Sequence, residues 1–259
     1  MTEHIDQMNT LIRLESTPSR IISLVPSQTE LLYDLGVGER LVGLTKFCIH
    51  PNDWFRNKSK IGGTKTVDIE KVRALKPDLI IGNKEENTKS DIEELSQIAP
   101  VWMSDIQNLE DAYQMIDQVA SLVGEVEKGR ELVSEIHTGF NRLTTNSEIE
   151  KSVLYFIWKS PDLIAGKNTF IDEMLQQMGL TNSSVLERYP KVASEVQPDL
   201  VFLSSEPFPF TEKHVKEFEN HYPNAKVFIV DGEMFSWYGS RLKKSSIYFQ
   251  KLLEQITID

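Results

Sequence analysis

Short apolar runs alternate with amphipathic segments along most of the chain. Residues 21–25 and 226–230 are mainly apolar and rich in β-branched residues, a composition typical of buried strands. Amphipathic stretches follow, such as residues 27–35, in which leucines recur on one helical face. Strands that alternate with helices predict an α/β fold built on parallel sheets.

The same patterning predicts the other elements. Further strands are expected at residues 41–44, 79–82, 101–103, 153–158, 163–165 and 200–203. Further helices are expected at residues 68–75, 87–98, 108–123, 168–178 and 242–256. At the first helix, Ser27 and Glu30 have the spacing of a capping box, in which each side chain bonds the backbone near the other.

A longer amphipathic segment runs from residue 126 to residue 146. Its apolar side chains recur every three or four residues, so they form a single stripe. At 1.5 Å per residue the helix would be roughly 31 Å long, enough to cross the back of two lobes. We therefore expect two Rossmann-like lobes with parallel sheets, joined by one long backbone helix. The expected boundaries are an N-terminal extension at 1–19, an αβ lobe at 20–124, the linking helix at 125–147 and a second αβ lobe at 148–259.

Composition narrows the class of protein. The chain is 40% hydrophobic and 26% charged, with a net charge of -11, and it has no basic cluster, so nucleic acid and anionic membrane surfaces are poor partners. The single cysteine excludes an intramolecular disulfide, and no apolar run reaches the 18 residues of a membrane span. The first 20 residues are polar and lack the apolar core of a signal peptide, so the chain as written is expected in the cytoplasm, or in the periplasm if a leader has been removed.

Aromatic residues and a few charges follow the predicted strands. Ligands of open parallel sheets lie beyond the carboxyl ends of the strands, and this mixture suits a sizeable ligand with flat apolar faces and polar edges. Glycines and serines mark residues 231–241 as a loop, which favours Trp237 as the main contact. The other candidates from strand ends are Phe47, His50, Glu85, Trp158, Glu206, Phe208, Tyr238 and Arg241. The phenylalanines could equally be core residues, and Glu85 a solvated charge.

Little in the sequence points to catalysis or to a bound metal. Cys48 and His50 are weak metal candidates, because the other histidines lie at no recognisable ligand spacing. Gly166-Lys167 resembles the end of a P-loop, but Pro161 stands where the upstream glycine is needed. No nucleophile elbow, dinucleotide fingerprint or carboxylate pair is present. The sequence therefore favours a binding protein without a cofactor over an enzyme.

Three motifs resemble one known family. The run from Arg20 to Glu30, followed by Leu35-Gly36, is similar to the opening of the helical-backbone (class III) solute-binding proteins that serve ABC importers of vitamin B12 and iron chelates. Residues 69–72 with 75–81 resemble a second signature of that family, and residues 189–201 resemble a third. The resemblance covers nearly the whole chain from residue 20.

The resemblance implies a function and a set of residues. It implies two lobes holding a corrinoid, haem or ferric chelate between them, and one glutamate per lobe, Glu70 and Glu195, facing an ABC permease. Thr64 and Tyr189 match ligand-cleft positions of the family, as do Phe47, His50, Trp158 and Trp237, and Lys65 is taken with its neighbour Thr64. The protein is expected to be a monomer. A cytoplasmic carrier or sensor on the same fold is the alternative, and an enzyme of unknown reaction is a more distant one.

Overall fold

The computed structural model describes residues 1–144, 151–193 and 196–258. The chain divides into two compact units. Unit 1 comprises Met1–Ile106, Glu110–Glu135 and Tyr238–Arg241, and unit 2 comprises Gln107–Leu109, Ile136–Trp237 and Leu242–Asp259. Each unit is built around its own sheet of mainly parallel strands, so the predicted fold class is confirmed.

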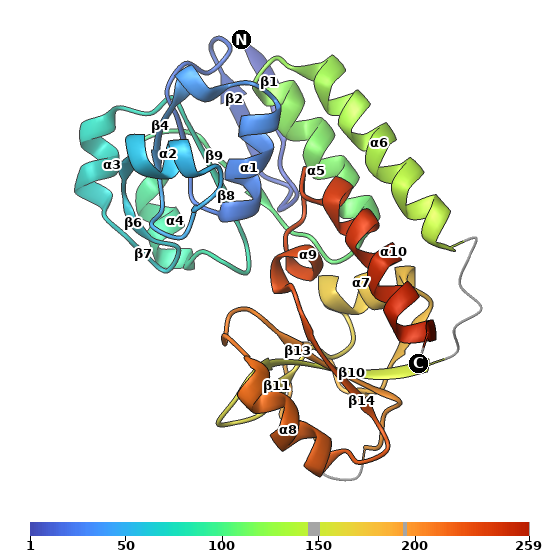
Figure 1. Ribbon diagram of the computed structural model, residues 1–259. Helices are drawn as coiled ribbons and strands as arrows, with labels where there is room; N and C mark the ends of the chain where they lie inside the picture. The colour runs from blue at the N-terminus through green and yellow to red at the C-terminus, as the bar shows by residue number, and fades with distance from the viewer. Residues whose placement is uncertain (145–150, 194–195, 259) are drawn as a thin grey trace. The chain divides into compact units, whose positions relative to one another are not determined.

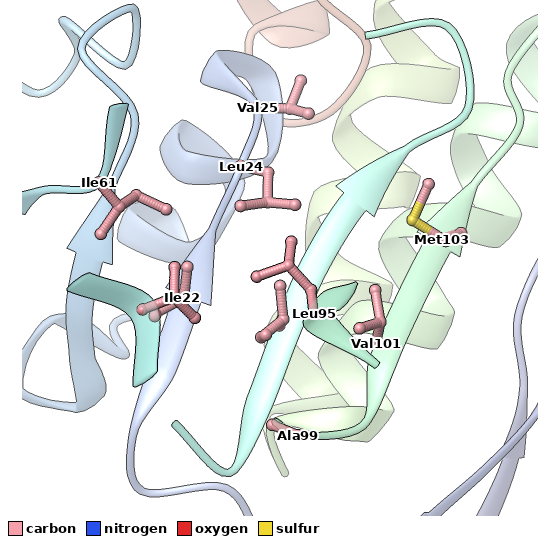
Figure 2. Close-up of a cluster of buried hydrophobic side chains, with 10 residues drawn as sticks. Ile22, Leu24, Val25, Ile61, Leu95, Ala99, Val101 and Met103 are labelled. Atoms are coloured by element: carbon pink, nitrogen blue, oxygen red, sulfur yellow. The ribbon is translucent and has the colours of Figure 1, made fainter. Parts of the chain in front are cut away.

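The sheet of unit 1 has five strands in the order β5-β4-β3-β8-β9, all parallel to their neighbours. The bounds are β3 (Ile21–Ser23), β4 (Leu41–Leu44), β5 (Ser59–Lys60), β8 (Leu79–Asn83) and β9 (Val101–Ser104). Ile22, Leu24 and Val101 lie in its core with Leu95 of α4 (Figure 2). The crossover elements that make parallel pairing possible are η1 (Gly38–Arg40), α1 (Pro26–Asp34), α2 (Asn52–Asn57), α3 (Ile69–Leu75), α4 (Lys89–Leu95) and the hairpin β6 (Gly62–Gly63) and β7 (Thr66–Val67).

The starts of two helices show where local patterns succeed and fail. Asp68 caps α3 as predicted, accepting a hydrogen bond from the Lys71 backbone N–H. The capping box predicted at Ser27 is wrong, because the N-cap of α1 is Val25, two residues earlier, and it makes no side-chain cap hydrogen bond. The Glu30 side chain, which was to close that box, instead forms an ion pair with Arg241.

An N-terminal hairpin covers the edge of the unit 1 sheet. It consists of β1 (Thr2–Ile5) and β2 (Leu11–Leu14), paired antiparallel. At its turn, Gln7 donates its backbone N–H to Met103 O at 3.1 Å, and Asp6 accepts the Met103 N–H at 3.3 Å. These bonds occupy backbone groups of β9 that an edge strand would otherwise leave open. The sequence reading placed no strands in this segment.

The sheet of unit 2 has the order β11-β10-β13-β14, with β12 also paired to β10. The strands are β10 (Lys151–Trp158), β11 (Leu163–Ile164), β12 (Leu180–Asn182), β13 (Leu200–Ser204) and β14 (Lys226–Val230); β11 alone among these pairings runs antiparallel. The helices are α7 (Phe170–Gln177), α8 (Glu212–His221), α9 (Gly232–Ser236) and α10 (Leu242–Ile258) (Figure 1). Phe156 of β10 packs on Phe218 of α8 with ring centroids 4.7 Å apart, and Tyr155 packs on Phe235 of α9 at 5.0 Å, so the sheet is covered on both faces.

Helix α6 (Val126–Thr144) follows α5 (Leu109–Leu122) and belongs to both units. Its residues up to Glu135 are part of unit 1, and those from Ile136 belong to unit 2. Leu132, Ile136, Phe140 and Leu143 are all buried, which is the stripe expected from their spacing. The last two residues of the predicted helix, 145 and 146, lie outside the described residues, and the exact lobe boundaries stay a prediction.

Among the residues that the structure describes, no helix combines the length and apolar character needed to span a bilayer.

Candidate functional site

Loops at the carboxyl ends of the unit 1 strands gather one set of candidate residues, called here the unit 1 edge: Lys46, Phe47, Thr64, Lys65, Glu85, Glu86 and Asn87. Phe47 follows β4 and is 51% exposed, with the Lys46 ammonium 5.1 Å from its ring centroid. A Cβ at Gly63 would lie 3.3 Å from the Phe47 ring, so this ring rests against the β6–β7 hairpin that carries Thr64. An exposed aromatic face is thereby fixed beside a cation.

Two asparagines hold the unit 1 edge together. Asn87 donates its side-chain amide to Thr64 O at 2.9 Å and accepts the Asn83 backbone N–H at 2.8 Å. Asn83 in turn accepts the backbone N–H groups of Glu85 and Glu86 at 2.9 and 3.2 Å. Burial raises the pKa of the Glu86 carboxyl, and the nearby Lys65 charge opposes that shift.

The structure thus brings together Phe47, Thr64, Lys65 and Glu85, four of the predicted residues. Sequence reasoning missed the role of Asn87. An asparagine four residues after another at a strand end was its only local signal.

Cys48 and His50 do not form a metal centre in the described part of the chain, where no three histidine, cysteine or carboxylate side chains gather around a common point. Cys48 is fully buried, its Sγ lies 3.2 Å from Thr45 Oγ1, and burial raises the pKa of the thiol. A protonated, inaccessible thiol is a weak nucleophile and a weak ligand. His50 is half-buried just before α2.

A second set of candidates lies at the carboxyl ends of β10, β13 and β14 and is called the unit 2 edge: Trp158, Glu206, Phe208, Asp231 and Glu233. Trp158 is 39% exposed, and its ring meets Phe208 at 5.8 Å and 70°. Phe208 packs in turn on Phe210, which is buried. The indole is therefore held by an aromatic cluster while one part of it stays accessible to a ligand.

Hydrogen bonds from two neighbouring side chains hold the Glu206 carboxylate at the unit 2 edge. Its Oε1 accepts hydrogen bonds from Ser236 Oγ at 2.7 Å and from Trp237 Nε1 at 3.1 Å. Its backbone oxygen accepts from Ser204 Oγ at 2.6 Å. Burial raises the pKa of the Glu206 carboxyl, and the charges of Glu233 and Asp231 act in the same direction.

A hollow of about 540 Å³ opens beside Glu206. It is lined by Ser205, Glu206, Ile229, Val230, Asp231 and Glu233. Two apolar and three acidic residues therefore line one hollow at the end of the sheet, a mixture that suits apolar surface bearing polar donors.

Tyr189 lies on a segment that extends the sheet past β11. Gly166 donates its N–H to Arg188 O at 2.7 Å and Ile164 to Pro190 O at 3.0 Å. Tyr189 is 40% exposed, with the Arg188 guanidinium 5.6 Å from its ring centroid. This places an accessible aromatic ring beside the edge strand of unit 2.

Three predicted ligand contacts are buried. The segment expected to be a loop contains helix α9, and Trp237 after it is only 7% exposed, with its N–H used by Glu206. Tyr238 is 9% exposed, and Arg241 donates to Glu30 within unit 1. The glycines and serines that suggested a loop instead permit close packing: Gly239, with φ +124, has no Cβ to meet Ser27 O, which would lie 3.2 Å away.

Of the two predicted docking glutamates, only Glu70 lies within the described residues. Glu70 stands in the first turn of α3 with its side chain 82% exposed, 3.5 Å from Arg73. Glu195 lies outside the described residues.

Comparison with known proteins identifies the family. The sequence profile described as "Periplasmic binding protein" matches residues 21–189. An ABC transporter substrate-binding lipoprotein of Bacillus subtilis is 30% identical over 189 residues, which cover 69% of this chain and 60% of that protein. The matched part thus spans less than two thirds of the lipoprotein's length. A vitamin B12-binding protein of Vibrio campbellii is 29% identical over 195 residues, covering 71% of this chain and 70% of the relative.

Solved structures agree on the fold. A possible iron-binding, periplasmic solute-binding protein of Staphylococcus epidermidis aligns with a TM-score of 0.79 at 22% identity, covering 93% of this chain and all of the other. The periplasmic vitamin B12-binding protein BtuF of Vibrio cholerae aligns equally well at 21% identity, covering 94% of this chain and 99% of BtuF. At such identities the likeness establishes the two-lobed fold and no more. The profile match over most of its length shows that this chain belongs to the periplasmic binding protein family.

Proposed function

We propose that this protein is the solute-binding component of an ABC importer and binds a corrinoid or a metal chelate. The observation that carries the proposal is the pair of accessible aromatic rings, Phe47 and Trp158, each held at the carboxyl end of a parallel sheet. Parallel α/β sheets bind ligands at that end. Rings fixed by packing offer flat apolar area to a macrocycle or an aromatic chelate without the entropy cost of ordering them on binding.

Polar groups beside each ring supply directed contacts. The unit 1 edge offers Thr64, Lys65 and Glu85, and the unit 2 edge offers Glu206 and Asp231. Because the described residues hold no cluster suited to a protein-bound metal, the metal of a chelate would arrive with its own ligands. His50 and Tyr189 remain proposed contacts. Trp237 supports the site from within the protein through its hydrogen bond to Glu206, whereas Tyr238 and Arg241 are buried and are not proposed as contacts.

The ABC permease is the proposed partner, docked through Glu70 and Glu195. The lipoprotein and periplasmic descriptions of the relatives support a location outside the cytoplasmic membrane, which we prefer to the cytoplasmic carrier or sensor.

Ligand titration tests the proposal. The purified protein would be titrated with cyanocobalamin, hemin and a ferric tris-catecholate while the fluorescence of its four tryptophans is recorded. We expect saturable quenching by at least one ligand, confirmed by calorimetry with a stoichiometry near one. Absence of saturable binding by all three would overturn the proposed function.

A further inference from the structure

The β6–β7 hairpin forms one wall of the unit 1 edge, and two close approaches define its shape. Gly62 has φ +98, and a Cβ there would lie 2.4 Å from Thr66 O, so glycine allows the chain to turn this tightly. A Cβ at Gly63 would lie 3.3 Å from the Phe47 ring and 3.5 Å from Lys46 Cε. The exposed Phe47 ring and the Lys46 side chain therefore lie against this hairpin, and its position determines theirs.

The second strand of the hairpin and its turn are held by different side chains. On the second strand, Val67 donates its backbone N–H to Asp91 of α4 at 3.3 Å. The turn carries Thr64 and the exposed Lys65, and Asn87 donates its side-chain amide to Thr64 O at 2.9 Å. Asn87 therefore ties the turn of the hairpin to the segment that follows β8.

The surroundings of Asn87 require a carboxamide. The residue is 7% exposed, and its Oδ1 accepts the Asn83 backbone N–H at 2.8 Å while its Nδ2 donates to Thr64 O. One side of the group thus faces a donor and the other an acceptor, which neither an ionised carboxylate nor an apolar side chain can satisfy. A Cβ at Gly82 would lie 2.8 Å from Asn87 Oδ1, so the amide fits tightly against the backbone of β8.

On these grounds we propose that Asn87 is a positioning residue for ligand binding, which fixes the Thr64–Lys65 turn and, through the hairpin, the accessible Phe47 ring in the ligand-free protein. The inference rests on the proposed function and assigns a role to a residue that acts through its neighbours. A wall that is already ordered spares the ligand the entropy cost of ordering it. Loss of the Asn87 amide therefore releases the turn and weakens binding.

The substitution Asn87→Asp isolates the hydrogen bond to the turn. Aspartate has the same shape, and one of its oxygens still accepts the Asn83 N–H, but the ionised carboxylate cannot donate to Thr64 O. The protonated acid can donate, and burial beside a carbonyl oxygen favours protonation. Acidification should therefore restore the bond that ionisation removes.

Fluorescence titration would give dissociation constants for cyanocobalamin, hemin and a ferric tris-catecholate with the wild type, Asn87→Asp, Asn87→Leu and Gln7→Glu, at about pH 8 and about pH 5. Gln7 is the matched control, because its Nε2 donates to Asp111 O at 2.8 Å and its Oε1 accepts the Asp105 N–H at 3.1 Å. It holds the β1–β2 hairpin, which carries none of the proposed ligand contacts. Melting temperatures at both pH values establish that each variant is folded.

For each ligand that the wild type binds, Asn87→Leu should weaken affinity about tenfold at both pH values, because the ligand must order the released turn. Asn87→Asp should show the same loss at about pH 8 and recover to within about threefold of the wild type at about pH 5. Glu85, Glu86 and His50 are present in wild type and variant alike, so the ratio of their dissociation constants isolates position 87. For Gln7→Glu this ratio should stay near one.

Hydrogen–deuterium exchange of the ligand-free proteins supplies a second readout. At about pH 8 the backbone amides of residues 64–67 should exchange faster in Asn87→Leu than in the wild type, whereas those of residues 21–24 in the centre of the sheet should not change. If Asn87→Leu does not fold, Asn87→Asp at the same pH should show the same local increase.

The outcomes separate this role from the solute-binding function. Wild-type affinity in both Asn87 variants, even with a lowered melting temperature, would show a purely structural bond and overturn the positioning role. An Asn87→Asp ratio that does not change with pH, or unchanged exchange of the turn, would also overturn it, and all three results leave solute binding standing. Failure of all three ligands to bind the wild type would overturn the proposed function, and this role with it.

Discussion

Arg241 donates hydrogen bonds to both carboxylate oxygens of Glu30, from Nε to Oε2 at 2.7 Å and from Nη2 to Oε1 at 3.1 Å, although the two residues are 211 positions apart. Both side chains are buried, at 6% and 7% exposure. The pair fastens the short segment Tyr238–Arg241 to helix α1 inside unit 1, between two stretches of chain that belong to unit 2.

Removing one partner of this pair should destabilise the protein strongly. Arg241→Met leaves the Glu30 carboxylate buried without its cation, which costs about 3–5 kcal/mol of unfolding free energy. Urea unfolding followed by circular dichroism measures the loss. Arg13→Met removes the cation of the exposed Glu3–Arg13 pair and should cost less than about 1 kcal/mol. The double variant Glu30→Leu/Arg241→Met should recover part of the stability. Equal losses of unfolding free energy in Arg241→Met and Arg13→Met would show that the buried pair contributes no more to stability than the exposed one.

The same pair shows why local patterns fall short. Ser27 and Glu30 have the spacing of a capping box, and nothing nearby in sequence reveals that a distant arginine takes Glu30 instead. The β1–β2 hairpin was missed for a similar reason. Its strands are four residues each, and its turn is held by Met103, almost a hundred residues away.

Elements with strong periodicity were predicted well. Strand β14 has the predicted bounds, because an apolar run between polar turns leaves little freedom, and α6 begins at the predicted residue with its stripe buried. Phe47 and Trp158 were predicted as ligand contacts because they stand at the carboxyl ends of parallel strands, and both are accessible there. Whether an aromatic in such a place is exposed depends on tertiary packing, and this is what separates Trp158 from Trp237.

These two tryptophans should respond differently to truncation. Trp158→Ala removes a ring that is 39% exposed and should weaken cyanocobalamin binding tenfold or more, with a small change in melting temperature. Trp237→Ala empties a buried site and deprives Glu206 of a donor, so it should cost about 3–5 kcal/mol of stability. Calorimetric titration measures the affinity of both variants, and thermal unfolding measures their stability. Full affinity in Trp158→Ala would remove this ring from the site.

The cap of helix α8 makes stability depend on pH. His214 Nδ1 accepts the Thr211 backbone N–H at 2.9 Å, which requires an unprotonated Nδ1. Burial of the ring lowers the pKa of His214 below its ordinary 6.5, and the Lys213 and Lys159 charges lower it further. The unfolded chain therefore takes up the proton at a higher pH than the folded one, so this stabilisation is complete above about pH 6.5 and decreases as the pH falls towards the folded-state pKa.

His214→Gln isolates that effect. Glutamine at this helix position can still accept the Thr211 N–H, but it does not titrate. Between about pH 8 and pH 5 the melting temperature of the wild type should fall further than that of the variant. Contributions from the other histidines are the same in both proteins and cancel when the two falls are subtracted. Parallel curves for the two proteins would show that the cap does not sense the proton.

Glu70 offers the sharpest separation of docking from ligand binding. Its side chain is 82% exposed in the first turn of α3, and its contact with Arg73 at 3.5 Å is a surface pair that contributes little to stability. Glu70→Ala should therefore leave the melting temperature and cyanocobalamin affinity unchanged.

If Glu70 meets an arginine of the permease, the variant should weaken binding to permease reconstituted in nanodiscs by about 2–5 kcal/mol, at least tenfold. Glu93→Ala is the matched control, because Glu93 is also exposed on a helix of unit 1 and forms a weak pair with Lys89 at 3.8 Å. Equal permease affinity of both variants would remove Glu70 from the docking surface, and loss of ligand affinity in Glu70→Ala would instead make it part of the ligand site.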